Sequence, residues 1–173
     1  VAVAGADDHG EMVHDCDAED GEAPASESAH PLDATEAPRP WRAAQAITTL
    51  RLMLNARHPN RSKKSDGIVG DPAHQARASD HNPWIVDGGH GVVTAFDVTH
   101  DPANGCDAGA LANALVASRD PRIKYIIWNR RICASYAVDG IAPWVWRPYG
   151  GRNPHNHHVH LSVKAEKALY DST

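Results

Sequence analysis

Four histidines lie close together near the C-terminal end of the chain, in the stretch NPHNHHVHLSV over residues 153–163. They are His155, His157, His158 and His160. The β-branched, alternating residues at the end of this stretch predict a short strand. Side chains alternate between the faces of a strand, so His158 and His160 should share one face, about 7 Å apart. Two imidazoles on one face can bind a metal ion, or provide one ligand and a general base.

A buried carboxylate upstream could complete such a site. Asp97 lies in the apolar segment 91–98 (GVVTAFDV), where an unpaired carboxylate would be costly to bury, so it requires a cation. His81, in a Ser-Asp-His sequence, and His90 precede it. One of these histidines, Asp97 and His160 would give three N/O ligands and leave a fourth position for water, which is typical of catalytic zinc sites. A structural Asp–His hydrogen bond is the alternative.

The elements that position these residues follow from periodicity and breaker residues. We expect a helix over 41–57, a long irregular segment over 58–90, a strand over 91–98, a helix over 108–118 capped by Asp107, a strand over 123–128, a turn and hairpin return over 129–143, strands over 144–149 and 159–163, and a helical turn over 164–170. This order predicts an α+β fold, with a small, mostly antiparallel sheet, packed helices and the metal site on the sheet.

Charge is distributed unevenly along the chain. Residues 1–40 carry eleven acidic residues and one arginine, whereas residues 41–173 carry sixteen Lys/Arg and eleven acidic residues. The first segment is also rich in Ala, Pro and Ser, so it cannot bury enough apolar surface to offset its ordering entropy. We expect a disordered acidic leader or linker over 1–40 and one folded domain over 41–173.

Other sequence features restrict the function less. Cys106 and Cys133 have no metal-binding spacing, and the sequence leaves open whether they form a disulfide. No apolar run reaches the roughly 20 residues of a membrane span. A net charge of +5 over 41–173, without an aromatic-basic stripe, disfavours a nucleic-acid partner.

The motifs resemble a family of cell-wall enzymes. The pattern S-x-H, glycine, A-x-D and a final H-x-H reads here Ser79-Asp80-His81, Gly91, Ala95-Phe96-Asp97 and His158-Val159-His160. It resembles the zinc D-alanyl-D-alanine peptidases of peptidoglycan, in the superfamily that includes lysostaphin-type and penicillin-insensitive murein endopeptidases. Endolysin-type and actinobacterial members look most similar, over about residues 41–163.

The resemblance implies roles for individual residues. His81, Asp97 and His160 would bind zinc. His158 would be the base or transition-state stabiliser beside the metal, and His155 would flank the zinc as in the penicillin-insensitive enzymes. Two further residues, Arg77 and Ser79, would bind the peptide or its terminal carboxylate. Trp84, Trp144, Trp146, Arg147 and Tyr149 are candidates to line the peptide site, although core packing is favoured for Trp144 and for Trp128.

Two departures from the family pattern leave alternatives open. Fifteen residues separate His81 from Asp97, whereas the family usually has six, which is the number between His90 and Asp97. We favour His81, because it has the Ser-x-His context and WIVDGG has the character of a loop insertion. The carboxypeptidase-like members have an acid three residues before the last ligand, where this chain has His157. His157 therefore competes with His158 as the base.

Taken together, the sequence predicts a secreted zinc metallopeptidase that hydrolyses bonds in the peptidoglycan stem or cross-bridge. It would be a monomeric hydrolase of carboxypeptidase or endopeptidase type, acting at the cell wall as an exported bacterial protein or a phage lytic enzyme. The alternative is a catalytically weak or inactive zinc domain that binds the cell wall or a partner. A metal-dependent nuclease and a structural metal domain are less favoured.

Overall fold

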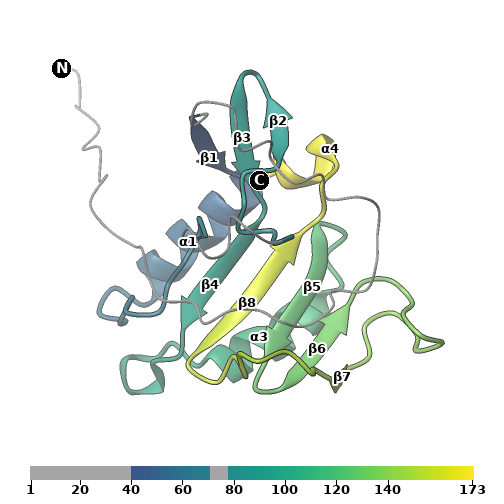
Figure 1. Ribbon diagram of the computed structural model, residues 1–173. Helices are drawn as coiled ribbons and strands as arrows, with labels where there is room; N and C mark the ends of the chain where they lie inside the picture. The colour runs from purple at the N-terminus through teal and green to yellow at the C-terminus, as the bar shows by residue number, and fades with distance from the viewer. Residues whose placement is uncertain (1–39, 71–77) are drawn as a thin grey trace.

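The computed structural model describes residues 40–70 and 78–173, which form an α+β fold with two sheets (Figure 1). Its elements are β1 (Trp41–Ala43), α1 (Gln45–Arg57), β2 (Ile85–Asp87), β3 (His90–Val93), β4 (Ala95–Thr99), the 3₁₀ turn η1 (Pro102–Asn104), α3 (Ala108–Ser118), β5 (Ile123–Trp128), β6 (Arg131–Ala134), β7 (Arg147–Pro148), β8 (His158–Val163) and α4 (Lys167–Tyr170). Apart from Pro40, the leader predicted for residues 1–40 lies outside the described residues.

The larger sheet has five strands in the order β4-β8-β5-β6-β7, and every pairing in it is antiparallel. The smaller sheet has the order β1-β3-β2, with β1 parallel and β2 antiparallel to β3. Figure 1 shows β3 leading directly into β4, so that one chain segment belongs to both sheets. The predicted mostly antiparallel α+β fold is confirmed.

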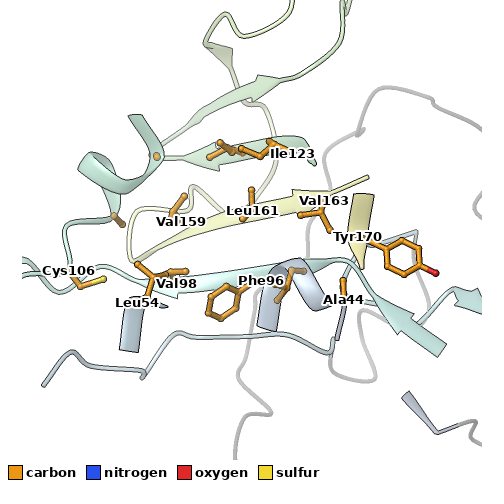
Figure 2. Close-up of a cluster of buried hydrophobic side chains, with 14 of the residues drawn as sticks. Ala44, Leu54, Phe96, Val98, Cys106, Ile123, Val159, Leu161, Val163 and Tyr170 are labelled. Atoms are coloured by element: carbon orange, nitrogen blue, oxygen red, sulfur yellow. The ribbon is translucent and has the colours of Figure 1, made fainter. Parts of the chain in front are cut away.

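The main hydrophobic core lies between one face of the larger sheet and the helices α1 and α3. Phe96 and Val98 of β4 and Val159 and Leu161 of β8 contribute to it, together with residues of both helices. Figure 2 shows these strand side chains gathered with Leu54 of α1. Because side chains alternate along a strand, the residues between them project from the opposite face. That opposite face carries Asp97, His158 and His160.

The helix α3 has the predicted cap. The Asp107 side chain accepts hydrogen bonds from the backbone N–H groups of Gly109 (2.8 Å) and Ala110 (3.1 Å). These bonds satisfy two of the N–H groups that have no partner within the first helical turn. The predicted bounds of this helix and of the strand over 123–128 are confirmed.

Predictions for the first half of the domain were wrong where tertiary pairing overrides local pattern. The predicted helix over 41–57 begins only at Gln45, because Trp41–Ala43 pairs with β3. The predicted strand over 91–98 is interrupted at Thr94, whose N–H donates to the Asp80 carbonyl instead of continuing a ladder. The segment 58–90, predicted to be irregular, contains the short strand β2.

Two predictions in the second half also need correction. The predicted strand over 144–149 shrinks to Arg147–Pro148, because Trp144 has a left-handed backbone (φ 64°) that is incompatible with a strand. The last helix covers only Lys167–Tyr170, since the Lys164 N–H bonds to the Arg122 carbonyl.

Cys106 and Cys133 are free, buried thiols. Within the described ranges, the helices are all too short or too polar to cross a membrane.

Candidate metal centre

Three buried side chains bring their ligand atoms together on the face of the larger sheet opposite the main core. The Nε2 atom of His81 lies 3.3 Å from Oδ2 of Asp97 and 3.2 Å from Nδ1 of His160. Nδ1 of His160 lies 3.0 Å from Oδ1 of Asp97. This group, the metal triad hereafter, can hold a metal ion. Metal–ligand bonds of about 2.0–2.2 Å place neighbouring ligand atoms about 3.0–3.5 Å apart, so the observed spacing suits a single ion.

Neighbouring groups fix which ring nitrogen of each histidine faces the triad. Nδ1 of His81 lies 2.7 Å from the carbonyl oxygen of Ile68, which can only accept, so Nδ1 carries the proton. Nε2 of a neutral His81 therefore presents its lone pair to the triad. Nε2 of His160 lies 2.9 Å from the Ser162 hydroxyl, which leaves Nδ1 to face Asp97. Outer partners of this kind are typical of metal-binding histidines.

The pairing of β4 with β8 sets the position of two triad residues. Asp97 and His160 are directly opposed in the antiparallel ladder, so their side chains project from the same face at close range. On the other edge of β4, the Asp97 N–H donates to the Gly67 carbonyl at 2.8 Å, and the Gly67 N–H donates to the Asp97 carbonyl at 3.3 Å. Tyr125 of β5 stacks on the His160 ring, with centroids 5.4 Å apart.

A tight turn over residues 79–82 supplies the third triad residue. The Asn82 N–H donates to the Ser79 carbonyl, and the His81 N–H donates to the Ser79 hydroxyl at 3.2 Å. The buried carboxylate of Asp80 accepts from the Lys124 ammonium at 3.0 and 2.8 Å. The ion pair between Asp80 and Lys124 therefore anchors the turn that carries His81 to β5.

The electrostatic surroundings keep Asp97 ionised. Complete burial opposes ionisation, but in acid, where His81 and His158 are protonated, their positive charges and the hydrogen bond from His160 outweigh it. They hold the pKa of Asp97 well below its usual range. The triad therefore presents a negative oxygen ligand together with two imidazole nitrogens, which matches the ligand preferences of borderline divalent metals.

His158 and His155 lie beside the triad. Nε2 of His158 is buried 3.8 Å from Oδ2 of Asp97 and has no hydrogen-bond partner within the described part of the chain. Burial lowers the pKa of His158, partly offset by the Asp97 charge, so its imidazole is neutral near pH 7. His155 is fully buried and its ring contacts the rings of His158 and His160, with centroids 5.0 and 5.6 Å apart.

The alternatives left open by the sequence separate in the structure. His90 is exposed and its ring lies 3.3 Å from the Gly88 carbonyl, so His81 and not His90 joins the triad. His157 is also exposed, whereas His158 is buried beside Asp97. Ser79 acts within the turn through its hydroxyl. Arg77 lies outside the described residues.

The aromatic and basic candidates divide between the two faces of the sheet. Trp128 and Trp144, expected in the core, pack against the main core together with Trp146. Tyr149 instead packs on the triad face, where its ring lies 5.5 Å from that of His155. Sequence reasoning missed the supporting residues Ile68, Ser162 and Tyr125. For Ser162 alone a signal existed, since it lies two residues after His160 on the same strand.

Comparisons of the chain with protein-family models, with curated proteins and with solved structures gave no match.

Proposed function

We propose that the protein is a zinc-dependent peptidase that hydrolyses peptide bonds of peptidoglycan. The triad geometry is the single observation that carries this proposal: two imidazole nitrogens and one carboxylate oxygen, 3.0–3.3 Å apart. This set resembles three-ligand catalytic zinc sites, which keep a fourth position for water or substrate. The choice of peptidoglycan as substrate rests on the resemblance of the sequence motifs to the cell-wall peptidases. These motifs contain His81, Asp97 and the pair His158 and His160.

A bound zinc ion supplies Lewis-acid chemistry, lowering the pKa of water toward about 7 and polarising a peptide carbonyl. The chain itself supplies proton transfer. His158 is neutral, and its Nε2 is buried next to Asp97 without a hydrogen bond to any described residue. It can take a proton from the attacking water at that atom and give it to the leaving amine.

His155 is suited to hold the His158 ring in place. Its own ring lies edge-on to that of His158, and its Nδ1 lies 3.0 Å from the Asn153 carbonyl, which requires a proton on Nδ1. His155 also has a left-handed backbone (φ 50°), which is costly for a residue other than glycine. Its N–H donates to the Asn153 side chain at 3.0 Å, which helps to hold that conformation.

Metal content and hydrolysis, measured on the same preparations, test the proposal. We expect zinc in the wild type and in His90→Ala, and its loss from His81→Ala and His160→Ala. Only the first two should release new amino groups from isolated peptidoglycan. His90→Ala is the matched control, since it removes an exposed imidazole from the same segment.

Each failure has its own meaning. Zinc without hydrolysis would overturn the peptidase and support a domain that binds the wall or a partner. Absence of zinc from the wild type would overturn both. Loss of zinc from His90→Ala with retention in His81→Ala would contradict the triad itself.

A further inference from the structure

The metal triad continues across the sheet as a row of directly opposed residues. Asp97 pairs with His160, His160 with Ile127, Ile127 with Ile132, and Ile132 with Arg147. Directly opposed residues of antiparallel strands project from the same face. Arg147 on β7 therefore shares the face of the sheet that carries the triad.

The guanidinium of Arg147 has no partner among the described residues. It makes no hydrogen bond or ion pair there, and its Nη2 atom is shielded from solvent. By contrast, the half-buried Arg42 and Arg122 bond to Asp171 and Asp120, respectively. An arginine remains charged at every accessible pH, and leaving a shielded N–H group unbonded is costly. Arg147 is thus prepared for an anion that none of the described residues supplies.

Aromatic rings connect Arg147 to the triad. Tyr149, two residues along, contacts the His155 ring at 5.5 Å, and His155 contacts the His160 ring at 5.6 Å. Tyr136 packs in the same small cluster as Tyr149. Burial and the Asp80 charge raise the pKa of Tyr136, and the positive charge of Arg147 partly offsets them, as it also does for the raised pKa of Cys133.

The row sets a length scale for a ligand. Three strand spacings of about 4.8 Å separate the Cα atoms of His160 and Arg147 by about 14 Å. An extended peptide spans about 3.3–3.6 Å per residue, so about four residues would cover this distance.

We propose that Arg147 binds a carboxylate of an acidic peptide, at a position up to about four residues from the bond held at the triad. The planar guanidinium suits a carboxylate because it can donate two parallel hydrogen bonds. The inference deepens the proposed function and rests on it, since it names a substrate feature that the same site would select.

The test uses binding rather than turnover. A series of neutral, end-blocked hexapeptides carries one glutamate at successive positions, and each has a partner with glutamine at that position. Isothermal titration of the full-length chain with each pair gives the Glu/Gln ratio of affinities for wild type, Arg147→Gln and Arg51→Gln. Arg51 is the matched control, because it too is half-buried with an unbonded nitrogen but lies on α1, which packs on the opposite face.

We expect the wild type to favour glutamate about tenfold, as for a hydrogen bond to a charged group, and only at one position or two adjacent positions of the series. Arg51→Gln should keep this ratio, and Arg147→Gln should reduce it to about one. An unchanged ratio in Arg147→Gln, or equal or undetectable binding of all pairs by the wild type, would overturn the inference.

The outcome is separable from that of the proposed function. Position-dependent selectivity without hydrolysis of peptidoglycan would uphold the Arg147 site and reject the peptidase. Hydrolysis without selectivity would do the reverse.

Discussion

Two histidines on one strand, separated by a single residue, have different surroundings. His160 has both ring nitrogens engaged, one by Ser162 and one at the triad. His158 has an Nε2 without a hydrogen-bond partner in the described structure, 3.8 Å from Asp97. A ring that is held at both nitrogens suits a fixed metal ligand, whereas a ring with one unbonded nitrogen suits proton transfer. Under the proposed function, this difference would make His158 the base and His160 a metal ligand.

This division predicts different losses on substitution. His158→Gln should retain zinc and lower kcat for peptidoglycan hydrolysis by about 10²- to 10⁴-fold, the usual contribution of a general base. His157→Gln, which replaces an exposed neighbour, should leave both unchanged. Metal analysis and initial rates on the same samples measure both effects. A full rate in His158→Gln would exclude it as the base.

The residue types of the site were readable from the sequence, but their supports were not. Asp97 stood out because a carboxylate in an apolar strand needs a cation, and His160 because of strand alternation. The Ile68 carbonyl that orients His81 gives no sequence signal, since any residue has a carbonyl. Choosing His81 over His90 needed the Ser-x-His motif, because spacing alone favoured His90.

At the scale of elements, a β-hairpin explains the unusual spacing between His81 and Asp97. β2 and β3 form this hairpin around Gly88 and Gly89, which both have positive φ angles (57° and 82°). Glycine adopts such angles without steric cost. The hairpin carries the extra residues away from the site, with His90 exposed at its tip. The sequence led us to expect a loop insertion here, and its two strands are too short to show a period.

Gly91 links this hairpin to the metal site through a close contact. A Cβ atom at Gly91 would lie 2.6 Å from both Cβ and the carbonyl oxygen of Pro83, two residues after His81. Gly91→Ala should therefore displace the His81 turn, lowering the free energy of unfolding by about 1–3 kcal/mol and weakening zinc binding. Gly150→Ala is the control, because a Cβ there meets nothing within 4 Å. Urea unfolding and metal titration measure both effects, and equal behaviour of the two variants would contradict the contact.

A buried ion pair fixes the loop before the site. The Arg61 guanidinium donates to both carboxylate oxygens of Asp66, at 2.8 and 2.6 Å, and Asp66 accepts from the Thr99 N–H and hydroxyl. Removing one partner leaves a buried, uncompensated charge, so Arg61→Met should lower the free energy of unfolding by about 3–5 kcal/mol. Arg57→Met, on an exposed position of α1, should change it by less than about 0.5 kcal/mol. Denaturant unfolding compares them, and a similar small change in both would show that the pair contributes little.

At the scale of the whole molecule, ion pairs join the smaller sheet, near the start of the described domain, to the C-terminal helix α4. Arg42 of β1 donates to Asp171, after the last helix, at 2.8 and 2.7 Å, and to Asp87 of β2 at 2.7 Å. Lys167 of α4 also bonds to Asp87, at 2.6 Å. These groups connect residues 129 positions apart. No local pattern predicts such pairs, because exposed charges in a sequence give no indication of their partners.

This ion-pair network predicts a specific acid dependence. Hydrogen bonding to Arg42 lowers the pKa of Asp171 below 3.8, with burial opposing. A carboxyl group with a lowered folded-state pKa stabilises the fold above its unfolded pKa, and this contribution disappears as pH falls through the folded value. The wild type should thus be more stable than Asp171→Asn by about 1 kcal/mol near neutral pH, and the difference should vanish in strong acid.

The difference between the stabilities of the two proteins isolates this carboxylate, because every other titratable group is present in both. Urea unfolding from about pH 6 to about pH 2 measures it. Asp139→Asn is the control, since Asp139 is exposed in a turn and forms no ion pair with another described residue. It should show no such pH-dependent difference. If the free energies of unfolding of the wild type and Asp171→Asn differed by the same amount at every pH, packing of the side chain and not its charge would stabilise this contact.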